Sequence, residues 1–589
     1  MDSTTGKDQE NTMKILLVAV NAKYIHSNLA VYSLRAYAKE YEDVIELAEF
    51  TINHSTEDIL KGIYQQQADV IAFSCYIWNI DLISKVIVEL KKVQPAIKIW
   101  FGGPEVSYDA RQCLETHKEL DGIIIGEGEQ IFLELTGYYV DRKKELSEIS
   151  GLAFRDSANS ITITSDRPLL SLEEIPFPYT QVETFRNKII YYESSRGCPF
   201  SCSYCLSSID KRVRLRDTEL VKRELKFFFD YKVLQVKFVD RTFNCNKKHA
   251  MDIWRFIKEQ DNGITNFHFE ISADLLGEEE IEFLATLRPG QVQLEIGVQT
   301  TNPDTLAIIH RKTDFDKLSN NVRRIQAVRN IHQHLDLIAG LPLEDYTSFA
   351  NSFNEVYRLK PDQLQLGFLK VLKGSGMEEE SKNYGIVHQG TPPYEVLFTD
   401  QLPYPDLLRL KGVREMVEAY YNSGQFTYSI LFLEHFFQTP MLLYQALDDY
   451  YRRKWLDQLA HNRSRRYEIL LDFYREIVLI LKMEEEKADF TALFLEILVL
   501  DLYLREDMKS RPQFVGNIRK PKNSYEIYDT LGIDRDYAHM EYFNYDVFAS
   551  CETGQPVKKD MLLVFDYSNR DILNKAAKLI IVEQTGTEK

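Results

Sequence analysis

Three of the seven cysteines in this chain lie within eight residues, in a pattern that suits metal binding. Cys198, Cys202 and Cys205 have the spacing C-x3-C-x2-C and follow a predicted strand. Soft thiolates at this density bind zinc or an iron–sulfur cluster. Zinc normally takes four ligands, and no nearby histidine completes the set. The pattern therefore favours a [4Fe–4S] cluster with one open iron over a zinc knuckle completed by a distant ligand.

The other four cysteines are scattered. We expect Cys75 and Cys113 to be structural and assign no role to Cys551. Cys245 follows the second barrel strand, where it could approach the active site, but a small buried side chain is the favoured interpretation. Seven cysteines in 589 residues are too few and too uneven for a disulfide framework. Residues 1–12 are polar, without an apolar signal core, and we expect a flexible leader there. No stretch reaches the ~18 apolar residues of a membrane span, so we expect a cytoplasmic protein that makes no membrane contact.

Composition excludes several classes of protein. Apolar residues make up 44% of the chain and charged residues 27%, an ordinary globular mixture. Collagen-like, mucin-like and wholly disordered proteins are therefore excluded. Lys and Arg number 71 against 89 Asp and Glu, which gives a net charge of −18. That balance argues against a generally basic nucleic-acid binder but leaves room for a local basic patch.

The elements that must position these residues begin with an α/β pattern over residues 13–140. Short apolar runs at 14–20, 69–74 and 97–101 alternate with helical patterns. Buried strands separated by helices predict a doubly wound, Rossmann-like sheet. Ligands bind at the carboxyl ends of such strands, and the sequence places Gly-rich turns there, at 102–105 and 126–129.

A Pro-rich connector over 141–188 leads to a second α/β region over 189–375. Its six candidate strands suit a full or partial (β/α) barrel, whose active site lies at the carboxyl ends of the strands. The strands are expected at 189–193, 235–239, 266–271, 291–297, 332–338 and 363–371. Residues 376–589 lose this rhythm and predict a mainly helical accessory or substrate domain.

The cysteine segment and the barrel strands together resemble the radical S-adenosylmethionine (SAM) enzymes. Segment 193–205 (ESSRGCPFSCSYC) matches the family's cluster loop. Four further motifs follow in order at predicted strand ends: 239–244 (VDRTFN), 267–273 (FHFEISA), 297–306 (GVQTTNPDTL) and 336–344 (DLIAGLPLE). The resemblance implies that Cys198, Cys202 and Cys205 ligate the cluster, whose open iron chelates SAM. One-electron reduction would then cleave SAM to methionine and a 5′-deoxyadenosyl radical.

The same resemblance implies which residues contact SAM. In the family the second strand end binds the SAM amino group largely through backbone, and an aromatic between the last two cysteines lies against the adenine. The implied SAM-binding residues are Tyr204, Asp240, Glu270, Gln299, Arg311 and Asp336.

The N-terminal region resembles the cobalamin-binding domain that precedes the barrel in cobalamin-dependent radical SAM enzymes. The resemblance rests on segments 21–26, 74–79 (SCYIWN), 102–105 (GGPE) and 126–129 (GEGE). It implies a cobalamin surrounded by Ser74, Tyr76, Gly102, Gly103, Gly126 and Glu127. The D-x-H-x-x-G motif for a histidine on cobalt is absent, so we expect no histidine ligand and a polar loop role for His26.

The C-terminal region resembles an uncharacterised domain found downstream of such modules, and it carries two basic clusters among aromatic residues. The first consists of Arg452, Arg453, Lys454, Arg463, Arg465 and Arg466. The second consists of Arg505, Lys509, Arg511, Arg519, Lys520 and Lys522. They could hold a polyanion such as a tRNA loop. The alternative is a solvated helix face with ordinary salt bridges.

Together these resemblances imply a cobalamin-dependent radical SAM enzyme with a [4Fe–4S] cluster, SAM and cobalamin. A low-potential donor such as flavodoxin or ferredoxin would supply electrons. The commonest reaction of the class methylates an unactivated carbon or phosphorus of a small molecule, peptide or tRNA. The alternative is a non-methylating reaction: rearrangement, cyclisation or reduction of a modified tRNA nucleoside such as epoxyqueuosine in queuosine biosynthesis. A non-catalytic cofactor sensor would predict loss of a cluster cysteine, and all three are present.

Overall fold

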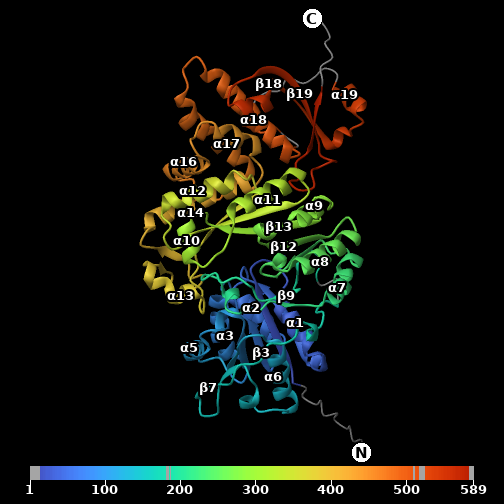
Figure 1. The fold of residues 1–589 in the computed structure, drawn as a ribbon, viewed down its shortest axis with the longest axis vertical. Helices are drawn as coiled ribbons and strands as arrows, with labels where there is room; N and C mark the ends of the chain where they lie inside the picture. The colour runs from blue at the N-terminus through green and yellow to red at the C-terminus, as the bar shows by residue number, and fades with distance from the viewer. Residues whose placement is uncertain (1–12, 181–184, 186, 509–510, 516–523, 583–589) are drawn as a thin grey trace, which may run out of the picture.

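A computed structural model describes the chain apart from residues 1–12, 181–184, 186, 509–510, 516–523 and 583–589. The leader expected at 1–12 therefore lies outside the described residues. Figure 1 shows three parts stacked along the long axis, with the N-terminal part (blue) at one end, the barrel region (green) in the middle and the C-terminal part (orange and red) at the other end.

The N-terminal part is a doubly wound sheet, as the sequence predicted. Its strand order is β2-β1-β3-β4-β5-β6-β7, and the first five strands are parallel. These are β1 (Ile15–Asn21), β2 (Ile45–Thr51), β3 (Val70–Ser74), β4 (Lys98–Gly102) and β5 (Gly122–Ile124). The antiparallel hairpin of β6 (Leu152–Arg155) and β7 (Ile161–Ile163) extends the sheet, so part of the expected connector belongs to it.

Alternating side chains bury both faces of this sheet. Along β1, Leu17 and Ala19 join one core cluster with α1 (Leu29–Tyr37) and α6 (Glu129–Asp141). Leu16 and Val18 join another, with α2 (Thr56–Tyr64), α3 (Ile80–Val93) and α5 (Ala110–Thr116). Because the inner strands β1 and β3 are buried along their whole length, a ligand can reach them only at their ends.

The middle part is a partial barrel of six parallel strands in the order β15-β14-β13-β12-β11-β8. The strands are β8 (Ile190–Tyr192), β11 (Gln235–Phe238), β12 (Asn266–Ile271), β13 (Val292–Gln299), β14 (His332–Ala339) and β15 (Gln363–Phe368). No pairing between β8 and β15 closes the ring among the described residues. The covering helices are α7 (Thr218–Asp230), α8 (Lys247–Glu259), α9 (Glu278–Leu284), α11 (Phe315–Val328) and α12 (Tyr346–Tyr357).

The C-terminal part is mainly helical, as expected, with a small antiparallel sheet. Its sheet is β18 (Ala538–Tyr545), β19 (Lys558–Asp566) and β20 (Lys578–Val582). Its longer helices are α14 (Tyr404–Val417), α15 (Thr427–Glu434), α16 (Pro440–Arg453), α17 (Arg463–Phe473) and α18 (Lys487–Arg505). Within the described part of the chain, no helix has both the length and the apolar character needed to cross a bilayer.

The carboxyl edge of the N-terminal sheet docks against the barrel. The loop after β1 meets the start of the first barrel strand, where the Ser27 amide and hydroxyl donate to the Ile189 carbonyl at 3.3 and 2.9 Å. On the next strand of the sheet, Glu49 pairs with Lys188 at 2.7 Å. The edge that binds ligands in doubly wound sheets is therefore turned toward the second α/β part.

Candidate functional site

The three clustered cysteines lie on the loop after β9 (Ser195–Arg196), and all three are free thiols. Cys198 and Cys202 are buried and Cys205 is half-buried. Gly197, at the root of the loop, has φ +94°, and a β-carbon there would lie 2.0 Å from the Arg212 carbonyl oxygen. Only glycine allows the backbone to pass so close to Arg212, so Gly197 is required for the sharp turn that leads into the cysteines.

A cavity of about 130 Å³ opens beside this loop, at the carboxyl ends of the barrel strands. It brings Cys202 together with Arg241, which follows β11. Four of the predicted SAM-binding residues also line it, namely Glu270, Gln299, Arg311 and Asp336. These residues come from three strand ends and a following loop, so only the fold places them together.

Buried polar atoms without partners show that this cavity suits a polar ligand. Gln299 Oε1 and Arg311 Nε are buried and accept or donate no hydrogen bond. Gln299 has φ +72° and lies at a register shift in β13, a bulge that re-aims its side chain. Native proteins rarely leave such groups unsatisfied. The cavity therefore fits SAM, whose carboxylate and ammonium would meet charges of both signs here.

The charges in the cavity are tuned by burial. Burial, and then the neighbouring carboxylate of Glu295, raise the pKa of Glu270 to about 7. Lys237 Nζ lies 3.6 Å from Glu270 and partly offsets that rise. A cationic ligand group beside Glu270 would favour its ionised form.

Tyr204 does not line the cavity, but it contacts Arg311, which does. The Nη1 atom of Arg311 donates to the Tyr204 hydroxyl at 3.3 Å, and Nη2 donates to the Gly297 carbonyl. Nη1 also lies 3.8 Å from Cys202 Sγ. Arg311 thus links the cluster loop to the end of β13.

Asp240 lies near the site but does not line the cavity. Its buried carboxylate accepts hydrogen bonds from the Ser194 amide at 3.0 Å and from the Ser194 and Ser195 hydroxyls at 2.6 Å each. The side chain therefore holds the root of the cluster loop instead of facing a ligand. Its neighbours Arg241 and Thr242 are the ones that reach the cavity.

A second polar layer adjoins the cavity, and two of its members, Glu295 and Asp336, line it. The motifs pointed only to Asp336 among these residues. Glu295 accepts from Lys237 at 2.8 Å and lies 2.9 Å from His268, and His334 lies 2.9 Å from Asp336. Glu295, His334 and Asp336 place possible metal-ligating atoms within 4.8 Å of one another. The ammonium of Lys237 already neutralises Glu295. The signal in the sequence was the polar alternation within strands that should be apolar on both faces.

The residues predicted around cobalamin lie on neighbouring strand ends of the N-terminal sheet. Ser74 ends β3, Gly102 ends β4 and Gly126 follows β5, and these three strands are adjacent. Gly103 has φ +116°, and a β-carbon there would lie 2.5 Å from the Cys75 carbonyl oxygen. At Gly126, with φ +82°, a β-carbon would meet nothing within 4 Å. That edge has room for a ligand.

A flat aromatic pair accompanies this edge. The rings of Tyr76 and Trp78 stack at 4.3 Å with 7° between their planes. Trp78 is 44% exposed although it is large and apolar. An open edge with glycines and a flat aromatic surface suits a macrocycle such as a corrin.

Glu127 and His26 both contact the barrel part directly. Glu127 binds Arg214 through both oxygens and lies 3.4 Å from Arg196. The Nδ1 atom of His26 lies 2.7 Å from the Tyr191 hydroxyl, and burial lowers the pKa of His26. Glu127 is therefore occupied by ion pairs instead of facing the open edge, and His26 has a polar loop role.

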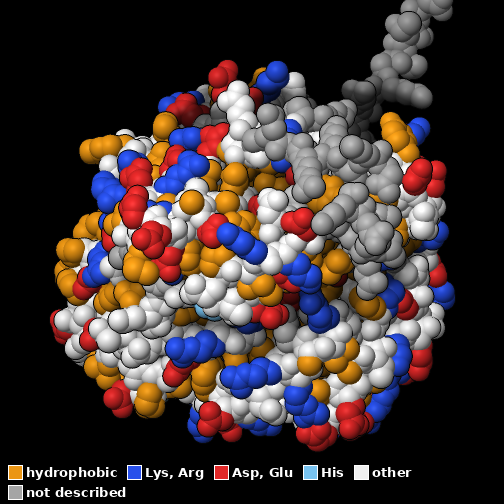
Figure 2. Space-filling view, turned by 90° about the horizontal axis from the view of Figure 1, so that it is seen from above, with side chains coloured by type: hydrophobic (Ala, Val, Ile, Leu, Met, Phe, Trp, Pro, Cys, Tyr) orange, Lys and Arg blue, Asp and Glu red, His pale blue; other side chains and the backbone are white. Residues whose placement is uncertain are grey.

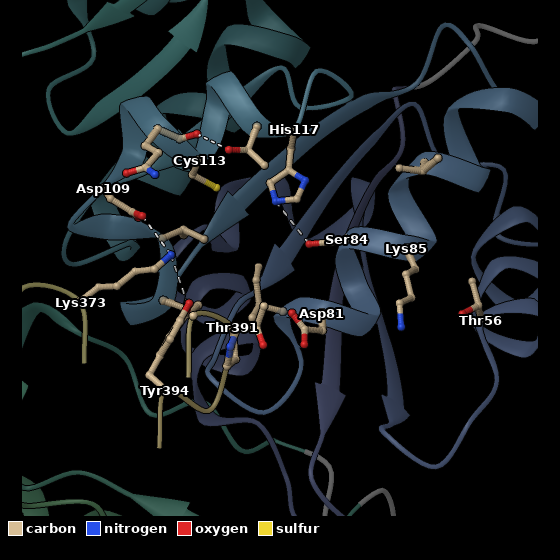
Figure 3. A pocket seen from close by; sticks show the side chains of 18 of the residues that line it. Thr56, Asp81, Ser84, Lys85, Asp109, Cys113, His117, Lys373, Thr391 and Tyr394 are labelled. Atoms are coloured by element: carbon tan, nitrogen blue, oxygen red, sulfur yellow. Dashed lines mark hydrogen bonds and ion pairs between the residues drawn. The ribbon is translucent and has the colours of Figure 1, made fainter. Parts of the chain in front are cut away.

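A larger cavity of about 830 Å³ lies beside α4 (Pro104–Ser107), between α3, α5 and the segment around 373–394 (Figure 3). Lys373 pairs there with Asp109 at 2.9 Å and with Glu105 at 3.6 Å, and Tyr394 donates to Glu105. Cys113 faces the same cavity, and burial raises the pKa of its thiol to about 12, so it stays protonated. The start of the C-terminal part thus forms one wall beside the GGPE turn.

The first basic cluster is mostly paired with carboxylates. The pairs are Arg452–Asp448, Arg453–Glu476, Lys454–Glu476, Arg463–Glu506 and Arg465–Glu468. The interleaved Tyr450, Tyr451 and Tyr467 are buried, while Trp455 is exposed. Seen from the C-terminal end, Lys and Arg are interspersed with Asp and Glu (Figure 2). These contacts give no separate support to a tRNA substrate.

The second basic cluster is only partly described. Arg505 donates to the Asn574 carbonyl, and Arg511 pairs with Glu541 at 2.8 Å. The remaining members, Lys509, Arg519, Lys520 and Lys522, lie outside the described residues.

Three protein-family models match this chain, in the same order along the sequence as the domains that the motifs predicted. Residues 15–136 match the B12 binding domain, and residues 192–356 match the Radical SAM superfamily. Residues 382–567 match a family described as a protein of unknown function (DUF4080). Cobalamin and SAM are therefore the cofactors that the first two domains take, in agreement with the sequence prediction.

Two curated relatives are methyltransferases. The cobalamin-dependent radical SAM methyltransferase TokK of Streptomyces tokunonensis is 25% identical over 74% of this chain and 70% of its own length. The 2-(S-pantetheinyl)-carbapenam-3-carboxylate methyltransferase of Streptantibioticus cattleyicolor is 24% identical over 63% of this chain, which spans 58% of that protein. Among solved structures, the cobalamin-dependent SAM radical enzyme OxsB with aqua-cobalamin shares the fold, with TM-score 0.59 and 15% identity over 86% of this chain and 83% of its own.

Proposed function

We propose that this chain, a cobalamin-dependent radical SAM enzyme, transfers a methyl group from SAM to an unactivated carbon of its substrate. The observation that carries this proposal is the contact between the cluster loop of the barrel part and the carboxyl edge of the N-terminal sheet. The cluster loop lines the polar cavity, and its flanking strands are ion-paired with the glycine-rich turn at the end of the N-terminal sheet. Related proteins named as methyltransferases, including a hopanoid C-3 methylase, favour methyl transfer over rearrangement or reduction.

The two halves of this site lie in contact. Ion pairs of Glu127 and Glu129 with Arg196 and Arg214 join the glycine-rich turn of the N-terminal sheet to the strands that carry the cluster loop. Cys202, on that loop, lines the polar cavity. When bound, the cluster and SAM supply one-electron cleavage of SAM, and cobalamin supplies a cobalt that carries methyl groups.

In this proposal the chain's own residues hold and orient the cofactors. Cys198, Cys202 and Cys205 ligate the cluster. Arg311 binds the SAM carboxylate, because its guanidinium is buried, partly unpartnered and 3.8 Å from Cys202. Glu270 and Asp336, on the opposite strand ends, bind the SAM ammonium. These positions suit a reaction that must exclude water from a radical.

Three finer features belong to the same proposal. An external one-electron donor such as flavodoxin or ferredoxin reduces the cluster, and it would approach past the half-buried Cys205 and the exposed Ile209. The protein works in the cytoplasm, where its seven free cysteines stay reduced. We also propose the domain division 13–140, 141–188, 189–375 and 376–589, with the hairpin of β6 and β7 in the connector joined to the N-terminal sheet. The last part would select the substrate, because Thr391 and Tyr394 line the larger cavity.

The test uses SAM carrying a deuterated methyl group. The anaerobically reconstituted and reduced protein is incubated with labelled SAM, cobalamin and an extract of its source cells, and all small molecules are examined by mass spectrometry. We expect 5′-deoxyadenosine together with a product that gains one labelled methyl group. The Cys202→Ala variant is the matched control and should give neither. Formation of 5′-deoxyadenosine without any labelled methyl in cobalamin or product would contradict methyl transfer.

A further inference from the structure

An ion-pair network joins the turn at residues 126–129 (the GEGE turn) to the strands that carry the cluster loop. These strands, β9 and β10 (Arg214–Leu215), form the cluster hairpin, residues 195–215, which contains all three cluster cysteines. Arg196 Nη2 donates to Glu129 Oε1 at 2.5 Å, and Nη1 lies 3.4 Å from Glu127 Oε2. The contacts cross from the N-terminal sheet to the barrel part.

The partner strand of the hairpin is held by the same turn. Arg214 lies directly opposite Arg196 in the antiparallel pair. Its two terminal nitrogens bind the two oxygens of Glu127, and Nη1 also donates to the Leu170 carbonyl at 2.6 Å. This bidentate geometry fixes orientation as well as distance. Both strands of the cluster hairpin are therefore tied to one turn of the neighbouring part.

Burial makes the network rigid. The Glu129 side chain is 6% exposed and the Arg196 side chain 17%. Salt and solvent screen such pairs far less than surface pairs.

The network also joins the borders of the two predicted cofactor sites. Gly126, with open space before it, borders the edge assigned to cobalamin. Its neighbour Glu127 contacts Arg196, which lies two residues before Cys198. On the barrel side, Asp240 holds the preceding Ser194 and Ser195. The start of the cluster loop is thus held by contacts with both parts of the molecule. We call the ion pairs of Arg196 and Arg214 with Glu127 and Glu129 the clamp.

We propose that Arg196 is a positioning residue, which through Glu127 and Glu129 sets the distance between the cluster loop and the cobalamin-binding edge. The identity of the two cofactors rests on the proposed function, whereas the clamp is a property of the cofactor-free chain. Cluster assembly needs the cysteines, and SAM cleavage needs the cavity. Methyl transfer also needs the two sites at a fixed separation, and a displacement of about 1 Å can cost a reaction roughly a hundredfold. Loss of the clamp therefore uncouples the two reactions.

The first experiment tests the clamp without any cofactor. Hydrogen exchange is followed in the cofactor-free chain for Glu129→Gln and for Glu134→Gln as the matched control. Glu134 lies on the same helix α6 and makes comparably buried pairs, but with Arg167 and Lys144. We expect amides of the cluster hairpin, such as that of Cys198, to exchange about tenfold faster in Glu129→Gln only. Equal protection in both variants would overturn the clamp.

The second experiment tests coupling. Cluster-loaded wild type and Glu129→Gln are reduced with SAM and free cobalamin, and 5′-deoxyadenosine and methylated cobalamin are both measured. We expect the ratio of methylated cobalamin to 5′-deoxyadenosine to fall at least about tenfold in Glu129→Gln. Arg196→Lys keeps the positive charge but loses the planar guanidinium that can bind two carboxylates at once. Its ratio of methylated cobalamin to 5′-deoxyadenosine should lie between those of Glu129→Gln and wild type. An unchanged ratio would overturn the positioning role. A wild type that methylates no cobalamin, yet shows the exchange difference, would retain the clamp and refute the proposed function.

Discussion

The Nη1 atom of Arg311 lies 3.8 Å from the Sγ of Cys202, although 109 residues separate them in the sequence. The other arm of Arg311 binds the Gly297 carbonyl at the end of β13. A ligand on a cluster held by the three clustered cysteines would lie within reach of this guanidinium. The contact links the cysteine loop to the polar cavity.

Replacement of Arg311 should weaken SAM binding. A hydrogen bond to a charged group contributes about 1.5–3 kcal/mol, so we expect Arg311→Ala to raise the SAM dissociation constant at least tenfold, since about 1.4 kcal/mol is a factor of ten. Equilibrium dialysis of SAM against cluster-loaded, unreduced protein measures this. Arg324→Ala, which breaks the exposed pair with Glu278, is the control and should bind SAM normally. Normal SAM affinity in Arg311→Ala would remove Arg311 from the site.

Replacement of Asp240 should loosen the cluster loop and leave SAM affinity nearly intact. An amide offers one acceptor oxygen instead of two, so Asp240→Asn loses part of the bonding to Ser194 and Ser195. We expect chelators to remove iron clearly faster than from wild type, with SAM affinity changed by less than about threefold. Iron release and SAM dialysis are measured side by side. A large loss of SAM affinity with normal iron retention would restore the direct contact that the motif implied.

Two glycines at the sheet edge should respond differently to alanine. Gly126→Ala adds only the strain of a left-handed residue, about 1–2 kcal/mol, because its β-carbon meets nothing. We expect the chain to fold and to bind cobalamin more weakly. Gly103→Ala should instead disrupt the turn itself, since its β-carbon collides with the Cys75 backbone.

Gly263→Ala is the matched control for strain, because Gly263 has φ +73° and equally open surroundings within the barrel part. Thermal unfolding and cobalamin titration distinguish the three variants. Equal cobalamin affinity in Gly126→Ala and Gly263→Ala would show that the ligand does not approach Gly126.

Glu344, behind the site, should make stability depend on pH. Burial raises its pKa to about 8 from the ordinary 4.5, and its partner is the Thr300 hydroxyl at 2.6 Å. The folded chain therefore holds this proton more tightly than the unfolded chain, and stability falls as pH rises from 4.5 to 8. A shift of about 3.5 pKa units corresponds to roughly 5 kcal/mol.

Glu344→Gln stays neutral, so it should gain stability relative to wild type as pH rises. Unfolding curves at several pH values between 4.5 and 8 measure the difference. Parallel pH profiles for the two proteins would mean that Glu344 is ionised in the folded chain.

Motif order was enough to predict the chemistry, because each motif lies at a strand end and parallel strand ends converge. Glu270, Gln299 and Arg311 meet at one cavity for that reason. The partners of Asp240 and Glu127 could not be predicted, because a carboxylate that binds a ligand and one that binds a serine or arginine look alike in sequence. Arg196 and Glu129 are 67 residues apart and belong to the barrel part and the N-terminal part, so no local sequence pattern predicts their contact.

The second polar layer was missed for a different reason. A strand buried on both faces normally has near-continuous apolar residues, yet the barrel strands alternate, and the inward positions hold Lys237, His268 and Glu295. The alternation is visible in the sequence, but its meaning depends on which face closes over the barrel interior. The packing of the helices against one face of the strands shows that the other face, with its polar side chains, points into the barrel.

The central claim is that Cys198, Cys202 and Cys205 hold a cluster that cleaves SAM beside a bound cobalamin. The most direct measurement is 5′-deoxyadenosine formation by the anaerobically reconstituted, reduced chain, compared with its Cys198→Ala variant. The wild type should bind iron and cobalamin and form 5′-deoxyadenosine, while the variant should keep cobalamin and form none. Formation of 5′-deoxyadenosine by Cys198→Ala at the wild-type rate would contradict the account.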